Sequence, residues 1–196
     1  GACRLEDTVV YLGDELPADA IVTNGAGNYA AWVHRYYSYR RYGTQLAPRS
    51  GSMGYGLPAA VAAKLQHPER VVVCFAGDGC YMMHGQELAT AVQYGANIII
   101  IVANNNMYGT IRMHQEKRFP GRVAATRLAN PDFAALARSY GAFGATVERS
   151  EDFAGVFAQA MDADRPALIE LRTDPEAITP RITLTGLQSS KPNPQV

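Results

Sequence analysis

The chain has 196 residues, of which 47% are hydrophobic and 18% charged, with 18 basic and 18 acidic side chains. A chain of this size can bury one sizeable core, and its balanced charge gives no electrostatic bias toward nucleic acid or an anionic membrane. No apolar run reaches the length of about 20 residues that spans a bilayer, and we expect neither a membrane segment nor a signal peptide. Three cysteines without metal-site spacing favour reduced thiols and a cytoplasmic location.

Alternating strands and helices are predicted along the chain. Continuous apolar runs at 70–76 and 97–103 are typical of strands buried on both faces of a parallel sheet. Further strands are predicted at 20–23, 143–147 and 167–171, and helices at 54–66, 85–94, 131–140 and 151–161. This order predicts an α/β fold: a doubly wound, mostly parallel sheet with helices on both faces.

Residues 1–184 are expected to form one domain. Asn130 stands just before the helix predicted at 131–140 and is the candidate for its N-cap. The segment 185–196 is polar and contains prolines, so we expect it to be a flexible C-terminal tail.

Polar residues follow the two most apolar predicted strands. Gly77-Asp78-Gly79 ends the first of them and Asn104-Asn105-Asn106 ends the second. A right-handed crossover through the helix between them would bring both strand ends to one edge of the sheet, where α/β proteins bind ligands. Either motif alone is more often an ordinary turn or loop. Together, the Asp78 carboxylate and the Asn105 side-chain oxygen predict a divalent cation held against a diphosphate, with the glycine turn close to the phosphate.

These motifs resemble the cofactor signature of thiamine-diphosphate-dependent enzymes. The similarity continues through residues 49–60 (RSGSMGYGLPAA) and 86–92 (QELATAV), and it is greatest to the acetolactate synthase large subunit, or carboligase, branch. It extends over about residues 21–171, with three motifs in the order found in the family. The resemblance implies thiamine diphosphate and Mg²⁺ as cofactors, a 2-keto acid as substrate and a homo-oligomeric assembly.

The resemblance also implies roles for individual positions. Asp78, the Asn105 side chain and the Met107 carbonyl would bind Mg²⁺. Met53 would support the bent cofactor, in a loop whose backbone grips the aminopyrimidine. The residues implied at the cofactor are Asn28, Tyr29, Gly51, Ser52, Met53, Gly77, Asp78, Gly79, Cys80, Asn105, Tyr108 and Gly109.

Two positions depart from the pattern of the family. Gly27-Asn28-Tyr29 stands where many carboligases have Gly-Gln-His, which leaves open the side-chain contacts of this loop to phosphate. Cys80 stands in place of the usual serine, so a weak thiol donor replaces a good hydroxyl donor. Neither change alters the implied metal ligands.

The glutamate that activates the cofactor in the resembled family comes from a separate pyrimidine-binding domain, normally on another subunit. No residue of this chain is identified in that role, and Glu87 is expected to be structural. We therefore interpret the chain as the diphosphate-binding domain of such an enzyme, either excised or a natural split subunit, and inactive alone.

The intact enzyme is expected to decarboxylate a 2-keto acid and to ligate the resulting enamine to a second carbonyl. The alternatives are a simple 2-keto acid decarboxylase and a non-catalytic binding or regulatory module that keeps the fold. A dinucleotide-binding oxidoreductase is disfavoured because no G-x-G-x-x-G motif follows the first predicted strand.

Overall fold

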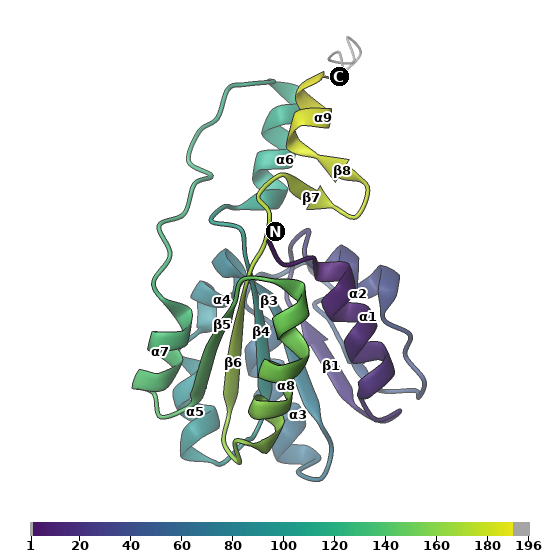
Figure 1. Cartoon of the computed structure of the whole chain (residues 1–196), viewed down its shortest axis with the longest axis vertical. Coiled ribbons are helices and arrows are strands. Elements are labelled where there is room, and N and C mark those ends of the chain that lie inside the picture. The colour runs from purple at the N-terminus through teal and green to yellow at the C-terminus, as the bar shows by residue number, and fades with distance from the viewer. Residues whose placement is uncertain (1, 190–196) are drawn as a thin grey trace.

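A six-stranded parallel sheet forms the centre of the molecule (Figure 1). The structure, a computed structural model, describes residues 2–189. The strand order is β2-β1-β3-β4-β6-β5. The chain places β2 on one side of β1 and all later strands of the sheet on the other side, as in doubly wound folds. The strands are β1 (Ile21–Asn24), β2 (Gln45–Leu46), β3 (Val72–Gly77), β4 (Ile99–Asn104), β5 (Phe143–Val147) and β6 (Ala167–Arg172).

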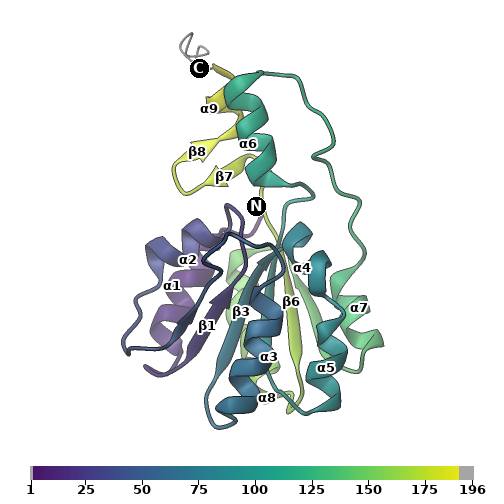
Figure 2. The same cartoon turned by 180° about the vertical axis from the view of Figure 1, so that it is seen from behind.

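Helices cover both faces of this sheet, which confirms the predicted fold class (Figures 1 and 2). Successive side chains of β3 point to opposite faces: Val73 and Phe75 pack under α1, α2 and α8, while Val72 and Cys74 pack under α3, α5 and α7. The helices of the domain are α1 (Leu5–Glu15), α2 (Ala30–Tyr36), α3 (Gly56–Gln66), α4 (Asp78–His84), α5 (Glu87–Gln93), α6 (Gly109–Arg118), α7 (Phe133–Ser139) and α8 (Phe153–Asp162), which the short 3₁₀ turn Ser150–Asp152 precedes.

The helix predicted at 85–94 is present as α5, and a separate short helix that was not predicted, α4, precedes it; Gly85 and Gln86 lie between the two. A side chain at Gly85 would come within 2.8 Å of the Tyr81 ring, which is buried edge-on against Phe133. The close approach of Tyr81 therefore requires glycine where α4 ends.

The predicted cap of the helix at 131–140 was wrong. Helix α7 begins at Phe133, and the Asp132 side chain accepts a hydrogen bond from the backbone N–H of Ala135 at 2.8 Å. Asp132 is therefore the N-cap, because its carboxylate satisfies a helix-end donor. Asn130 lies two residues earlier, and its side chain takes part in a different network.

A small outer lobe stands above the carboxyl edge of the sheet (Figure 1). It consists of α6, the hairpin of β7 (Ala177–Thr179) and β8 (Ile182–Thr183), and helix α9 (Leu184–Ser189). Its apolar centre is Met113 with Ile178, Leu184 and Leu187. Residues 185–189 of the segment predicted as a tail thus belong to a packed helix, because Leu184 and Leu187 share one face, and residues 190–196 lie outside the described part.

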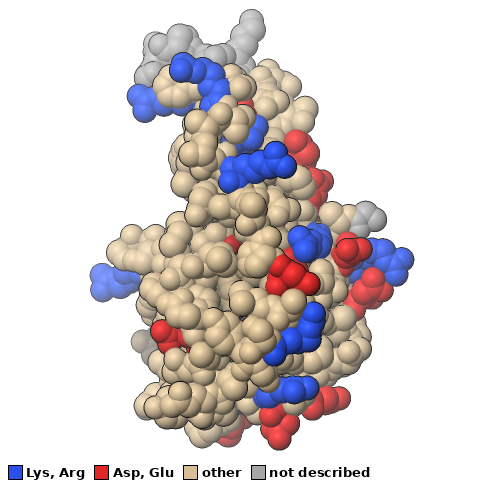
Figure 3. All heavy atoms as spheres, turned by 90° about the vertical axis from the view of Figure 1, so that its left-hand side faces the viewer, with Lys and Arg blue, Asp and Glu red and all other residues tan. Residues whose placement is uncertain are grey.

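Acidic and basic side chains are interspersed around the sheet on the face shown in Figure 3, as the balanced composition leads one to expect. The three cysteines are buried and free. Burial raises the pKa of Cys3 to about 11 and that of Cys74 to about 12, so both thiols are protonated and unreactive at neutral pH. Within residues 2–189, no helix is long and apolar enough to cross a membrane.

Gly144 tests how tightly α7 packs on β5. A Cβ at this position would lie 2.2 Å from the backbone carbonyl oxygen of Ala134, and that oxygen is fixed within helix α7. We expect Gly144→Ala to lower the free energy of unfolding by about 1–3 kcal/mol, measured by urea denaturation.

Gly155 provides the matched control for Gly144. It is exposed within α8, and nothing lies within 4 Å of the position that its Cβ would occupy. Gly155→Ala should raise the free energy of unfolding by about 0.5–1 kcal/mol, because alanine favours the helix. Equal effects of the two substitutions would contradict the close packing of α7 on β5.

Candidate functional site

The two polar motifs meet at the carboxyl edge of the sheet. In the pairing of β3 with β4, Gly77 lies opposite Ala103, which places Asp78 beside Asn104. The structure therefore brings together the strand ends that the sequence predicted to converge. The reason is the one anticipated, since neighbouring parallel strands end at the same edge.

A cavity of about 380 Å³ opens at this edge, between the sheet and the outer lobe. Eleven of the residues predicted at the cofactor or the metal line it: Asn28, Tyr29, Met53, Gly77, Asp78, Gly79, Cys80, Asn105, Met107, Tyr108 and Gly109. Gly51 and Ser52 do not line it; they are exposed on the neighbouring loop. Sequence reasoning missed two lining segments, 2–6 and 173–178, because they contain no recognisable motif and reach the cavity only through the fold.

Asp78 is a buried carboxylate at the base of this cavity, with only 3% of its surface exposed. Its Oδ1 accepts the backbone N–H of Gly79 at 2.8 Å, and its Oδ2 accepts the side-chain amide of Asn130 at 2.8 Å. Burial raises the pKa of Asp78, and these hydrogen bonds offset part of that rise. A cation beside Asp78 would favour its charged form, so the site suits a positive ligand.

The loop after β4 directs further oxygens to the same place. Asn106 adopts a left-handed backbone conformation with φ 58°, which asparagine tolerates better than most residues. The Asn105 Oδ1 accepts the backbone N–H of Met107 at 3.2 Å. The loop is held from the other side, where Tyr108 N–H donates to the Thr126 carbonyl at 2.9 Å. Asn105 and Met107 therefore line the cavity together with Asp78.

Two tyrosine rings pack against the glycine turn. A Cβ at Gly77 would lie 2.8 Å from the Tyr29 ring, and a Cβ at Gly79 would lie 2.5 Å from the Tyr108 ring. Both glycines are thus required in the structure by the close approach of aromatic side chains. Sequence reasoning attributed them only to the approach of phosphate.

Cys80 lies between the turn and the loop that contains Met53. Its Sγ accepts the Gly54 N–H at 3.1 Å and the Tyr29 hydroxyl at 3.3 Å. Burial raises the pKa of Tyr29 well above its ordinary value, so this hydroxyl remains protonated and donates. In this structure the thiol therefore acts as an acceptor that joins two loops.

Asn28 contacts helix α6 through its side chain. The Thr110 hydroxyl donates to the Asn28 Oδ1 at 2.9 Å and accepts the Asn28 backbone N–H at 3.0 Å. The Asn28 amide nitrogen lies 3.6 Å from the Met113 sulfur. These contacts join the loop before α2 to the outer lobe across the cavity.

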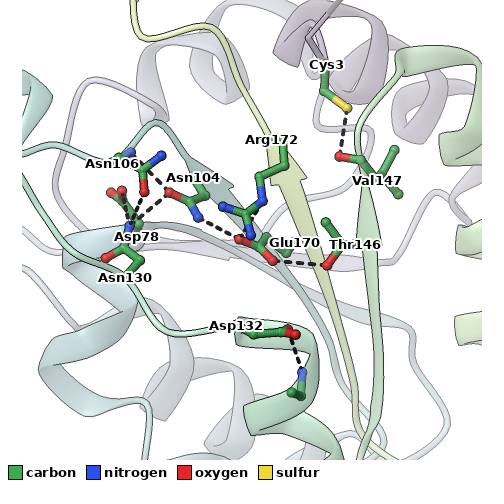
Figure 4. A network of polar contacts seen from close by, with 11 residues as sticks. Cys3, Asp78, Asn104, Asn106, Asn130, Asp132, Thr146, Val147, Glu170 and Arg172 are labelled. Atoms are coloured by element: carbon green, nitrogen blue, oxygen red, sulfur yellow. Dashed lines mark hydrogen bonds and ion pairs between the residues drawn. The ribbon is translucent and has the colours of Figure 1, made fainter.

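A polar network behind the site contains residues that sequence reasoning missed (Figure 4). Asn130 donates to Asp78 and Asn104, and Asn104 donates to Glu170 at 2.6 Å. Asn130 was mistaken for a helix cap. The sequence signal that could have identified Glu170 is a charged residue in the middle of the apolar run of β6. A charged residue at such a position is buried and needs polar partners, and Glu170 is fully buried in the structure.

Comparison with known proteins identifies the family. The model of the thiamine pyrophosphate enzyme C-terminal TPP binding domain matches residues 25–171. The chain belongs to this family. The match contains the glycine turn, the Asn105 loop and the strands that bring them together.

The curated relatives include acetolactate synthases. The chain is 34% identical over 173 residues to the acetolactate synthase large subunit of Parasynechococcus marenigrum, covering 87% of this chain and 28% of that protein. It is 33% identical over 165 residues to the isozyme 2 large subunit of Escherichia coli, covering 83% of this chain and 30% of that protein. The chain thus spans about 30% of the length of these relatives.

Among solved structures, the chain resembles the thiamine diphosphate-dependent 4-hydroxybenzoylformate decarboxylase of Rhodococcus jostii RHA1. The TM-score is 0.82 at 33% sequence identity, with 88% of this chain and 33% of that chain covered. The parallel sheet and its surrounding helices are therefore the fold of a thiamine-diphosphate-dependent enzyme.

Proposed function

We propose that the chain binds Mg²⁺ and the diphosphate of thiamine diphosphate at the carboxyl edge of its sheet, as part of an acetolactate synthase-like enzyme. The observation that carries this proposal is the buried Asp78 carboxylate at the base of the cavity, beside the Asn105 loop. One carboxylate, one amide oxygen and one backbone carbonyl suit a hard cation that takes its remaining ligands from phosphate and water. The donor set therefore fits the group that the family implies.

The proposed roles follow the positions of the residues. Asp78, the Asn105 side chain and the Met107 carbonyl hold the cation. Met53 lines the cavity and supports the bent form of the cofactor. The other proposed cofactor contacts are Asn28, Tyr29, Gly51, Ser52, Gly77, Gly79, Cys80, Tyr108 and Gly109.

Bound thiamine diphosphate supplies the electron sink for decarboxylating a 2-keto acid. The contribution of this chain is to fix the diphosphate end of the cofactor in the cavity that Met53 lines. The outer lobe closes one side of the cavity with Ala177 and Ile178, which restricts the access of water to that side.

We assign the intact enzyme to the carboligases, with a second carbonyl as the acceptor, because the curated relatives cited above are named acetolactate synthases. The 4-hydroxybenzoylformate decarboxylase supports the alternative of a simple decarboxylase. We further propose that a pyrimidine-binding domain of the same or another chain supplies the activating glutamate, in a homo-oligomer in the cytoplasm.

Trp32 provides a test of binding, because it is the one tryptophan of the sequence and it lines the cavity. We expect titration with thiamine diphosphate to change its fluorescence saturably, with higher affinity in Mg²⁺ than in EDTA. No saturable change under either condition would refute the proposed cofactor site. Product analysis of the intact enzyme with pyruvate then separates the two reactions: acetolactate indicates ligation and acetaldehyde indicates simple decarboxylation.

A further inference from the structure

The Asn130 side chain meets Asp78 from outside both sequence motifs. It lies in the connection between α6 and α7, which brings it to the carboxyl edge of the sheet (Figure 4). Its amide nitrogen lies 2.8 Å from Asp78 Oδ2 and 2.9 Å from Asn104 Oδ1. The same nitrogen is 3.5 Å from Asn106 Oδ1. One donor group thus faces oxygens from the ends of two neighbouring strands.

Glu170 fixes the orientation of Asn104. The glutamate is fully buried on β6 and pairs with Arg172 at 3.2 Å, and a carboxylate can only accept hydrogen bonds. The Asn104 amide nitrogen must therefore face Glu170, and it does so at 2.6 Å. The Asn104 oxygen is left to accept from Asn130 and from the backbone N–H of Asn106 at 3.1 Å.

This arrangement determines which end of the Asn130 amide faces Asp78. The nitrogen of Asn130 lies between two acceptors, Asn104 Oδ1 and Asp78 Oδ2. The opposite oxygen of Asp78 is held by the Gly79 N–H. Both oxygens of a nearly fully buried carboxylate are thus restrained from different sides, so the carboxylate plane has a defined orientation.

We propose that Asn130 is a positioning residue that orients the Asp78 carboxylate for the cation. The proposal rests on the proposed function, in which Asp78 is a metal ligand. Asn130 offers N–H donors to Asp78 and no free electron pair on that nitrogen, so it acts through Asp78 and does not itself bind the cation there. Each carboxylate oxygen has a second lone pair that remains available to a metal.

The test compares Asn130→Ala with the unmodified chain. Asn130 is half-buried in a connecting segment, so the variant is expected to fold. Thiamine diphosphate is titrated with saturating Mg²⁺ and with EDTA, followed by Trp32 fluorescence. Because partners that orient metal ligands typically contribute about 10–100-fold to metal affinity, the gain in affinity from Mg²⁺ should fall by about that factor. The affinity in EDTA should not change.

Asn97→Ala is the matched control. The Asn97 amide donates to Asp164 at 3.1 Å on the exposed surface, away from the cavity lining. It should leave the Mg²⁺-dependent gain unchanged. If Mg²⁺ raises the thiamine diphosphate affinity of Asn130→Ala as much as it does that of the unmodified chain, the proposal is overturned. It is also overturned if the variant loses affinity equally with Mg²⁺ and with EDTA, because that result indicates a structural role. If the unmodified chain itself shows no Mg²⁺-dependent binding of thiamine diphosphate, the proposed function is wrong, and the positioning role of Asn130 is then wrong as well.

Discussion

Asp78→Ala is expected to lower the Mg²⁺-dependent affinity of the chain for thiamine diphosphate by about 100-fold or more. Asp78 is the only charged group in the proposed donor set, and losing a ligand should exceed the roughly 10–100-fold effect typical of residues that merely orient ligands. Isothermal titration calorimetry with Mg²⁺ measures the change. Asp78→Asn keeps the shape of the side chain and removes its charge, so it should lose most of the same affinity.

Asp14 provides the control for this charge effect. It is exposed on α1 and does not line the cavity, so Asp14→Ala removes a carboxylate without touching the site. Its affinity should equal that of the unmodified chain. If Asp78→Ala also binds normally while circular dichroism shows both variants folded, Asp78 is not the metal ligand, and the cation site must be sought elsewhere.

The sheet and the convergence of Asp78 with Asn105 could be predicted because their causes are local. The runs that became β3 and β4 are apolar throughout, as strands buried on both faces must be, and the polar residues that end them meet wherever parallel strands adjoin. The start of helix α4 at Asp78 was harder to predict from the sequence. Gly77-Asp78-Gly79 reads as a turn, yet α4 begins at Asp78 itself and brings Gly79 beneath Tyr108.

The network behind the site could not be derived from the sequence because its contacts are non-local. Asn130 lies 52 positions from Asp78, and Glu170 lies 66 from Asn104. The rules for helix caps favour asparagine and aspartate equally, so they did not decide between Asn130 and Asp132, and the structure shows that Asp132 takes that role. The same limit applies to Tyr29 and Cys80, whose hydrogen bond depends on how α2 and α4 are placed around the end of β3.

In the outer lobe, helix α9 has only a weak sequence pattern and is stabilised by its packing against the rest of the lobe. Leu184 and Leu187 are too few to predict a helix from periodicity, but they pack against Met113 and Ile178. Glu116 on α6 is buried, and the Gly121 N–H, Arg112 and the Gln188 amide all donate to it. The Gly121 N–H is the main cause that lowers the pKa of Glu116, so this carboxylate stays charged and holds α6 to α9.

The isolated chain should bind the cofactor but show no measurable turnover of a 2-keto acid. Among the described residues, the acidic side chains that line the cavity are Glu6, Asp78 and Asp174, so Glu6 is the one glutamate that could take the activating role. Although burial raises the pKa of Glu6, hydrogen bonds from its backbone, Arg4 and Trp32 outweigh this effect and lower that pKa. A glutamate held ionised by two side-chain donors cannot readily give a proton to the aminopyrimidine.

A steady-state assay with saturating Mg²⁺ and thiamine diphosphate decides the question, using pyruvate as the probe substrate. Binding measured through Trp32 on the same sample separates an empty site from a loaded but inactive one. Addition of a pyrimidine-binding domain that provides the glutamate should restore turnover if the chain is half of a composite site. Robust pyruvate consumption by the chain alone would refute this half-site interpretation. Its loss in Glu6→Gln would then identify Glu6 as the activating group, since that substitution keeps the size of the side chain and removes its charge.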